Sequence, residues 1–151
     1  MLTLGVALGL LATVIIASPA MAAKAYMTDK SDQLVVVVHG TSSTEALSKK
    51  ELIDIYMGRF KNFPNGSTAT PIDYFKGSNQ RKAFYQLLVG KSERKIDAYW
   101  SRLLFSGRAT RPNKATSVAE IQQELQQNPS AIAYINAANV TEEMKIVYQF
   151  D

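Results

Sequence analysis

The stretch PIDYFKGSNQRKAFYQLLVG, residues 71–90, decides the predicted fold. Its β-rich opening, residues 71–75, predicts a strand. The apolar side chains from Ala83 to Leu88 recur at helical spacing and predict a helix. Between the two, Gly77 supplies a tight turn and Ser78 is a favourable N-cap. The stretch is therefore interpreted as a strand, a turn and a helix.

The first turn of this predicted helix is basic. Backbone N–H groups there have no partner inside the helix, and the helix dipole favours acidic neighbours. The chain instead places Lys76 before the turn and Lys82 after it. Free amides, a hydroxyl and an arginine at a helix start together suit an anion. The predicted anion-binding residues are Gly77, Ser78, Asn79, Gln80 and Arg81, and the alternative is a surface helix that happens to be basic.

The N-terminal segment has the character of a targeting sequence. Residues 2–17 are almost wholly apolar, and Ala20-Met21-Ala22 forms a small-x-small cleavage signal. We expect a signal peptide at residues 1–22, a disordered lead-in at 23–33 and one domain at 34–151, with a periplasmic location. The alternative is an uncleaved anchor, because the apolar run approaches the length that spans a bilayer.

Composition excludes several classes of protein. The chain has no cysteine, so a lipoprotein, disulfide staples and a thiol nucleophile are excluded. One histidine does not supply a usual zinc site, and we expect no metal and no cofactor. The net charge of +4 suits an anionic partner but is too modest to predict nucleic-acid binding.

A second candidate element follows the first apolar run. Residues 34–38, LVVVV, predict a central strand buried on both faces. The loop after it contains Thr41, Ser42 and Ser43, and loops after parallel strands are where α/β proteins bind ligands. These three hydroxyls are candidate donors to the anion, and the alternative is a plain polar connection.

The remaining segments predict an α/β architecture. Capping boxes begin helices at Ser48 and Ser117, a further helix follows Ser92, and strands are expected at residues 131–135 and 145–150. Strands separated by helices favour a three-layer, open, mostly parallel sheet with helices on both faces. The loop at residues 108–116 is basic. Its possible partner contacts are Arg108, Arg111 and Lys114, which are otherwise simply solvated.

Three ordered stretches resemble the phosphate-binding proteins of phosphate ABC transporters. LSKKELIDIYMG at 47–58 resembles the pattern L-[ST]-x-x-[EQ]-L-x-x-[IF]-[FY]-x-G of that family. GSNQRKAF at 77–84 resembles the family's G-S-G-T-[RS]-x-x-F loop, with Asn79-Gln80 in place of Gly-Thr. SAIAYI at 130–135 resembles its G-A-I-G-Y strand, with Ser130 and Ala133 in place of glycine.

The resemblance implies one lobe of a type 2 periplasmic binding protein. In that family Gly77 would form the turn, and Ser78, Gln80 and Arg81 would hold the oxyanion. The family's full proteins close two lobes on the ligand, and this chain supplies one, so its site would be half open. A permease, or a homodimer that rebuilds the clamp, is implied as a partner.

Three functions are weighed from these observations. The first is an exported phosphate- or oxyanion-binding protein. The alternative is a single-lobe module for protein–protein contact in the cell envelope, in which the anion site is weakened or lost. An enzyme is not expected, because His39 is the only conventional base and no nucleophile accompanies it at motif spacing.

Overall fold

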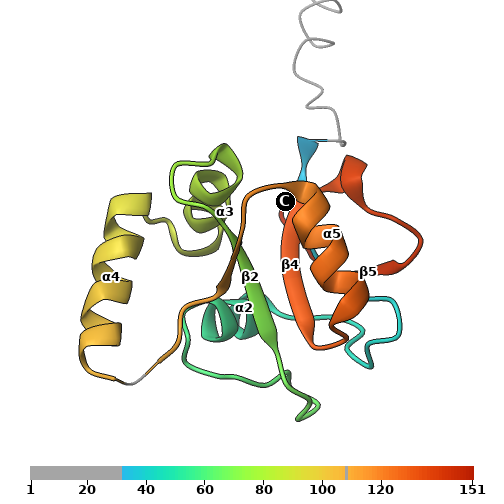
Figure 1. Cartoon of the computed structure of the whole chain (residues 1–151), viewed down its shortest axis with the longest axis horizontal. Helices are drawn as coiled ribbons and strands as arrows, with labels where there is room; N and C mark the ends of the chain where they lie inside the picture. The colour runs from blue at the N-terminus through green and yellow to red at the C-terminus, as the bar shows by residue number, and fades with distance from the viewer. Residues whose placement is uncertain (1–31, 108) are drawn as a thin grey trace, which may run out of the picture.

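A computed structural model describes residues 32–107 and 109–151 of the chain (Figure 1). The predicted signal peptide and most of the predicted lead-in lie outside these residues. The elements follow in the order β1 (Leu34–His39), α2 (Lys49–Tyr56), β2 (Thr70–Tyr74), α3 (Asn79–Val89), α4 (Glu93–Phe105), β3 (Asn113–Ala115), α5 (Val118–Gln127), β4 (Ala131–Asn136), the 3-10 turn η3 (Ala137–Asn139) and β5 (Met144–Gln149).

The strands form one mixed, mostly parallel sheet in the order β3-β2-β4-β1-β5. β2 pairs in parallel with both β3 and β4, whereas β1 is antiparallel to both β4 and β5. Four strands thus share one direction and β1 opposes them. The α/β prediction is confirmed. The apolar run of β1 indicates burial on both faces of the sheet. Because this pattern is the same for either strand direction, the sequence did not indicate that β1 is antiparallel to its neighbours.

Helices cover the sheet in two groups. α5 packs against β4 and β1, whereas α2, α3 and α4 contact one another in succession. Figure 1 shows α5 in front of the sheet, α2 behind it and α4 at the side next to β2. Trp100 fixes α4 here, because it is buried and its ring lies close to the backbone of Gly58 after α2.

The core contains a cluster of aromatic rings between the sheet and α3. Phe84 of α3 stacks on Tyr134 of β4, with ring centroids 3.7 Å apart and planes inclined by 2°. Tyr56 of α2 meets the Phe84 ring edge-on at 4.7 Å, and its hydroxyl donates to the Ile132 carbonyl at 3.1 Å. α3 is thereby held firmly against the sheet, and its N-terminus has a fixed position.

Two predicted helix starts are confirmed in detail. Ser48 and Glu51 form the reciprocal capping box of α2. The Ser78 side chain caps α3 by accepting from the Arg81 N–H at 3.1 Å. Gly77 before it has φ of +94°, a left-handed conformation that favours glycine, so this turn needs glycine at that position.

Candidate functional site

The turn between β2 and α3 contains the residues predicted to bind an anion. Its central group is the Arg81 guanidinium, which is 4% exposed. Three carboxylates surround it: Arg81 Nε donates to Asp73 Oδ2 at 3.1 Å, Nη1 to Glu93 Oε1 at 2.7 Å and Nη2 to Asp97 Oδ1 at 3.1 Å. The charge of Arg81 is therefore already matched within the protein.

Glu93, the first residue of α4, closes the helix start. The same oxygen, Oε1, that accepts from Arg81 also accepts from the Gly77 backbone N–H at 2.8 Å. A carboxylate of the chain thus lies where the sequence predicted an external oxyanion. The side chains of Asn79 and Gln80 form no hydrogen bond with any described residue, and Asn79 is exposed.

Asp73 joins this cluster to the core. Its carboxylate accepts from the Tyr85 hydroxyl at 3.0 Å and from the Tyr134 hydroxyl, in addition to Arg81. Burial raises the pKa of both tyrosines well above the ordinary value, and the negative charge of Asp73 adds to this. Both phenols therefore stay protonated and act as donors, so Asp73 is fully satisfied as a buried carboxylate.

The Arg81 guanidinium also affects the titration of Glu93 and Asp97. Burial alone would raise the pKa of Glu93, but the Gly77 N–H and the Arg81 guanidinium hold it below its usual value. At Asp97, burial likewise acts to raise the pKa, but Lys76 and Arg81 lower it below its usual value. The folded state thus favours the charged forms of Glu93 and Asp97. The stabilisation they give is present above the pKa values of these groups in the unfolded chain, and it is lost as the pH falls through their pKa values in the folded protein.

We therefore expect stability to fall as the solution is acidified below about pH 4.5, the ordinary carboxyl range. The Glu93→Gln variant should have a lower melting temperature than the parent near neutral pH, and this difference should shrink steadily below about pH 4.5. Thermal melts followed by circular dichroism between pH 3 and 7 measure it. A difference that is constant across the range would contradict the role of the Glu93 charge.

A basic pocket of about 190 Å³ opens beside this cluster. It lies between the β2–α3 turn, α4 and the segment that leads into β3, and its lining residues are Lys76, Arg81, Asp97, Ser101, Arg111 and Lys114. Lys76 Nζ pairs with Asp97 Oδ2 at 3.0 Å. Arg111 and Lys114 pair with no carboxylate of residues 32–107 or 109–151. One guanidinium and one ammonium group are therefore available to a ligand here.

β3 is the element that assembles this pocket. The prediction of an irregular loop at residues 108–116 was wrong in part, because Asn113–Ala115 pairs in parallel with β2. Its register sets Lys114 beside Asp73 and Asn113 beside Ile72. The pairing brings Arg111 and Lys114, predicted as partner contacts, next to Arg81, predicted as an anion ligand. Arg108 lies outside the described residues.

The loop with the three hydroxyls, which follows β1, lies at the opposite end of the strands from the α3 start. Because β1 is reversed, Val38 near its end pairs with Ile132 near the start of β4, which is also where β2 begins. Ser43 Oγ accepts from Asn65 at 2.9 Å, and Thr41 lines an open hollow with Glu142 and Glu143. The structure therefore does not bring Thr41, Ser42 and Ser43 together with the α3 start.

Three residues of α4 were missed by the sequence interpretation. Glu93, Asp97 and Ser101 recur every four residues, which places them on one face of a helix. That spacing was visible in the sequence, but nothing in it indicated that this face would meet Arg81. Among the described residues, no group of histidine, aspartate or glutamate is arranged to hold a metal ion.

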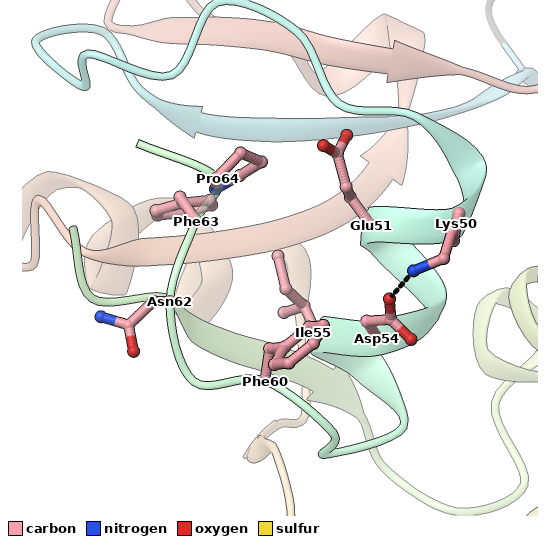
Figure 2. Close-up of a pocket in the computed structure, with 8 residues that line it drawn as sticks. All are labelled: Lys50, Glu51, Asp54, Ile55, Phe60, Asn62, Phe63 and Pro64. Carbon is pink, nitrogen blue, oxygen red and sulfur yellow. Dashed lines mark hydrogen bonds and ion pairs between the residues drawn. The ribbon is translucent and has the colours of Figure 1, made fainter. Parts of the chain in front are cut away.

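A second hollow, the Phe60 pocket, lies between α2 and the segment that follows it (Figure 2). It measures about 350 Å³. Figure 2 shows Ile55 and Phe60 side by side on one wall, with Phe63 and Pro64 across the pocket from the Lys50–Asp54 pair. Its apolar wall is partly open to solvent, because Phe60 is 60% exposed.

Comparison with known proteins supplies the remaining observation. Neither a family model nor a curated protein sequence matches the chain. Solved structures do: a putative phosphate ABC transporter substrate-binding protein with bound phosphate from Clostridium perfringens superimposes with a TM-score of 0.61 at 20% identity, over 77% of this chain and 44% of that one. The chain has the fold of one lobe of a phosphate receptor.

Two further receptors show the same likeness. An ABC-type phosphate transport receptor from Vibrio cholerae matches with a TM-score of 0.60 at 18% identity, and PstS from Borrelia burgdorferi with 0.59 at 14%. Each match covers 77% of this chain, and 45% and 46% of the receptors respectively. This receptor-like lobe therefore spans less than half the length of the solved receptors. Within its described residues, no helix has the length and apolar character needed to cross a membrane.

Proposed function

We propose that this receptor-like lobe is an exported, non-enzymatic oxyanion-binding protein of the periplasm, with phosphate as its principal ligand. The observation that carries the proposal is the basic pocket, in which Arg111 and Lys114 have no carboxylate partner among the described residues. The fold of the solved phosphate receptors supports the same ligand class. The site differs from the predicted one in its direct contacts.

Arg111 and Lys114 make these contacts, and Lys76 adds a third positive charge at the rim. The Lys76 side chain is 73% exposed, so it can move from Asp97 to a ligand at little cost. Arg81 has a different role, because its donors already serve Asp73, Glu93 and Asp97. It fixes α3 and α4 relative to β2 and so positions the residues that line the pocket. Such an open site implies weak binding, since solvent screens the charges.

Isothermal titration of inorganic phosphate tests the proposal. We expect binding in the micromolar to millimolar range, reduced at least about tenfold, or 1.4 kcal/mol, by Lys114→Ala and by Arg111→Ala. Lys49→Ala is the matched control, because Lys49 is exposed on α2 and lines neither the basic pocket nor the Phe60 pocket. Chloride at equal ionic strength corrects for screening. A flat titration, or equal losses in all three variants, would overturn the proposal.

A second candidate is a protein-interaction module in the cell envelope, and the Glu93 contact favours it. The Gly77 N–H and the Nη1 of Arg81 both donate to this carboxylate, so these two donors are already used within the protein. A permease, another envelope protein or a second copy of the chain would then cover the exposed side of the lobe. Photo-crosslinking in intact cells from position 114, together with a flat phosphate titration, would decide for this function.

A further inference from the structure

The basic pocket does not stand alone. A bridging pocket of about 210 Å³ adjoins it, and the half-buried Arg111 lines both. The bridging pocket continues to the Phe60 pocket, with which it shares Ile55 and Phe60. Besides Arg111, its polar lining residues are Lys61, Thr68, Thr70, Thr110 and Asn113. The three hollows are thus neighbours: Arg111 lines the first two, and Ile55 and Phe60 line the last two.

The size of these hollows limits what they can hold. Ligand sites in proteins commonly measure about 300–1,000 Å³. The basic pocket and the bridging pocket are each below that range, but together they reach roughly 400 Å³ and enter it. A small inorganic oxyanion would fill only the basic end. The combined space fits a ligand with a charged group and an organic part.

The chemistry of the walls changes along the same path. The basic end carries Lys76, Arg111 and Lys114, which suit a phosphate group. The other end carries the Phe60 ring and Ile55, which suit apolar carbon. Phe60 is 60% exposed, so its ring is accessible to a ligand. Charge at one end and exposed apolar surface at the other describe a single amphipathic anion.

We propose that the ligand of this site is an organic phosphate monoester, whose phosphate group lies at Arg111 and Lys114 and whose apolar part lies against Phe60. The inference rests on the proposed oxyanion-binding function and narrows its ligand class. The Arg111 guanidinium, which lines both the basic pocket and the bridging pocket, binds the phosphate. Phe60 then removes the organic group from water, so the ester binds more tightly than inorganic phosphate does.

Phenyl phosphate and inorganic phosphate are the probes, titrated into the full chain by calorimetry. We expect phenyl phosphate to bind about tenfold or more tightly than inorganic phosphate, which is 1.4 kcal/mol. Phe60→Ala should remove most of this preference and leave the affinity for inorganic phosphate unchanged. Lys114→Ala should weaken both ligands alike. Phe105→Ala is the control, because Phe105 is 97% exposed on α4 and lines none of the three pockets.

The outcomes separate the two proposals. Equal affinities for the two probes, unaffected by Phe60→Ala, would overturn the organic ligand and leave oxyanion binding in place. No heat with either probe would overturn both. Preference for phenyl phosphate that persists in Phe60→Ala would also contradict the inference, since the organic group would then lie elsewhere. Melting curves of each variant confirm that the substitutions leave the fold intact.

Discussion

Arg81→Ala should lower the free energy of unfolding by about 3–5 kcal/mol, the cost of removing one partner from a buried ion pair. The substitution leaves Asp73, Glu93 and Asp97 facing one another without their shared cation. Their side chains are 8%, 15% and 21% exposed, so water compensates for little of the lost charge. Urea denaturation followed by tryptophan fluorescence measures the change, because Trp100 is buried on the adjacent α4.

Lys82→Ala is the matched control for this prediction. Lys82 is the next residue of α3, it is exposed, and it pairs with no carboxylate in residues 32–107 or 109–151. Its loss should change the free energy of unfolding by no more than about 0.5 kcal/mol. If Arg81→Ala costs less than about 1 kcal/mol, the guanidinium does not hold the three carboxylates as the structure indicates. A loss of phosphate binding in Arg81→Ala would follow from this damage and would not by itself identify a ligand contact.

Phe84→Ala should lower the free energy of unfolding by about 3–5 kcal/mol, as is common when a large aromatic side chain is deleted from a core. Phe84 is completely buried. Its ring stacks on Tyr134 and meets the edges of Tyr56, Tyr85 and Phe150. The alanine leaves a cavity among rigid rings, which relax poorly, so the upper half of the range is expected.

Phe84→Leu provides the comparison, because it keeps apolar volume but removes the stacked ring. The loss should be about half of that for alanine, since the cavity is smaller. Urea denaturation at constant m-value gives both numbers. Equal losses for the two variants would show that ring stacking, not cavity volume, dominates at this position. A loss below about 1 kcal/mol for alanine would contradict the placement of α3 against the sheet.

Local patterns predicted much of the fold. The N-cap at Ser78, the capping box at Ser48 and the buried run of β1 depend on neighbouring residues, and the structure confirms each. The direction of β1 and the pairing of β3 with β2 depend on contacts between distant residues. A three-residue strand with mostly exposed side chains has no distinctive periodicity, so β3 was interpreted as a loop.

The candidate site follows the same division. From local charge alone, the sequence analysis predicted Arg81 as an anion ligand and Arg111 and Lys114 as possible partner contacts. It did not indicate that the chain would supply its own carboxylates to Arg81. Glu93 and Asp97 lie twelve and sixteen residues further along, and only the packing of α4 beside α3 brings them to the guanidinium. Ion pairs that form only through tertiary packing cannot be predicted from the spacing of neighbouring residues.

The meeting of Gln33 with Phe150 has a consequence for how such a unit can be joined to others. The Gln33 side chain donates to the Phe150 carbonyl, and Val35 of β1 pairs with Gln149 of β5. The first and last residues of the domain therefore lie side by side, at the end of the sheet where β1 begins and β2 ends. A domain with adjacent ends can be inserted into a loop of a host protein, or circularly permuted by a short connector, without opening its core. This lobe is therefore suited to insertion into another protein as one folded unit.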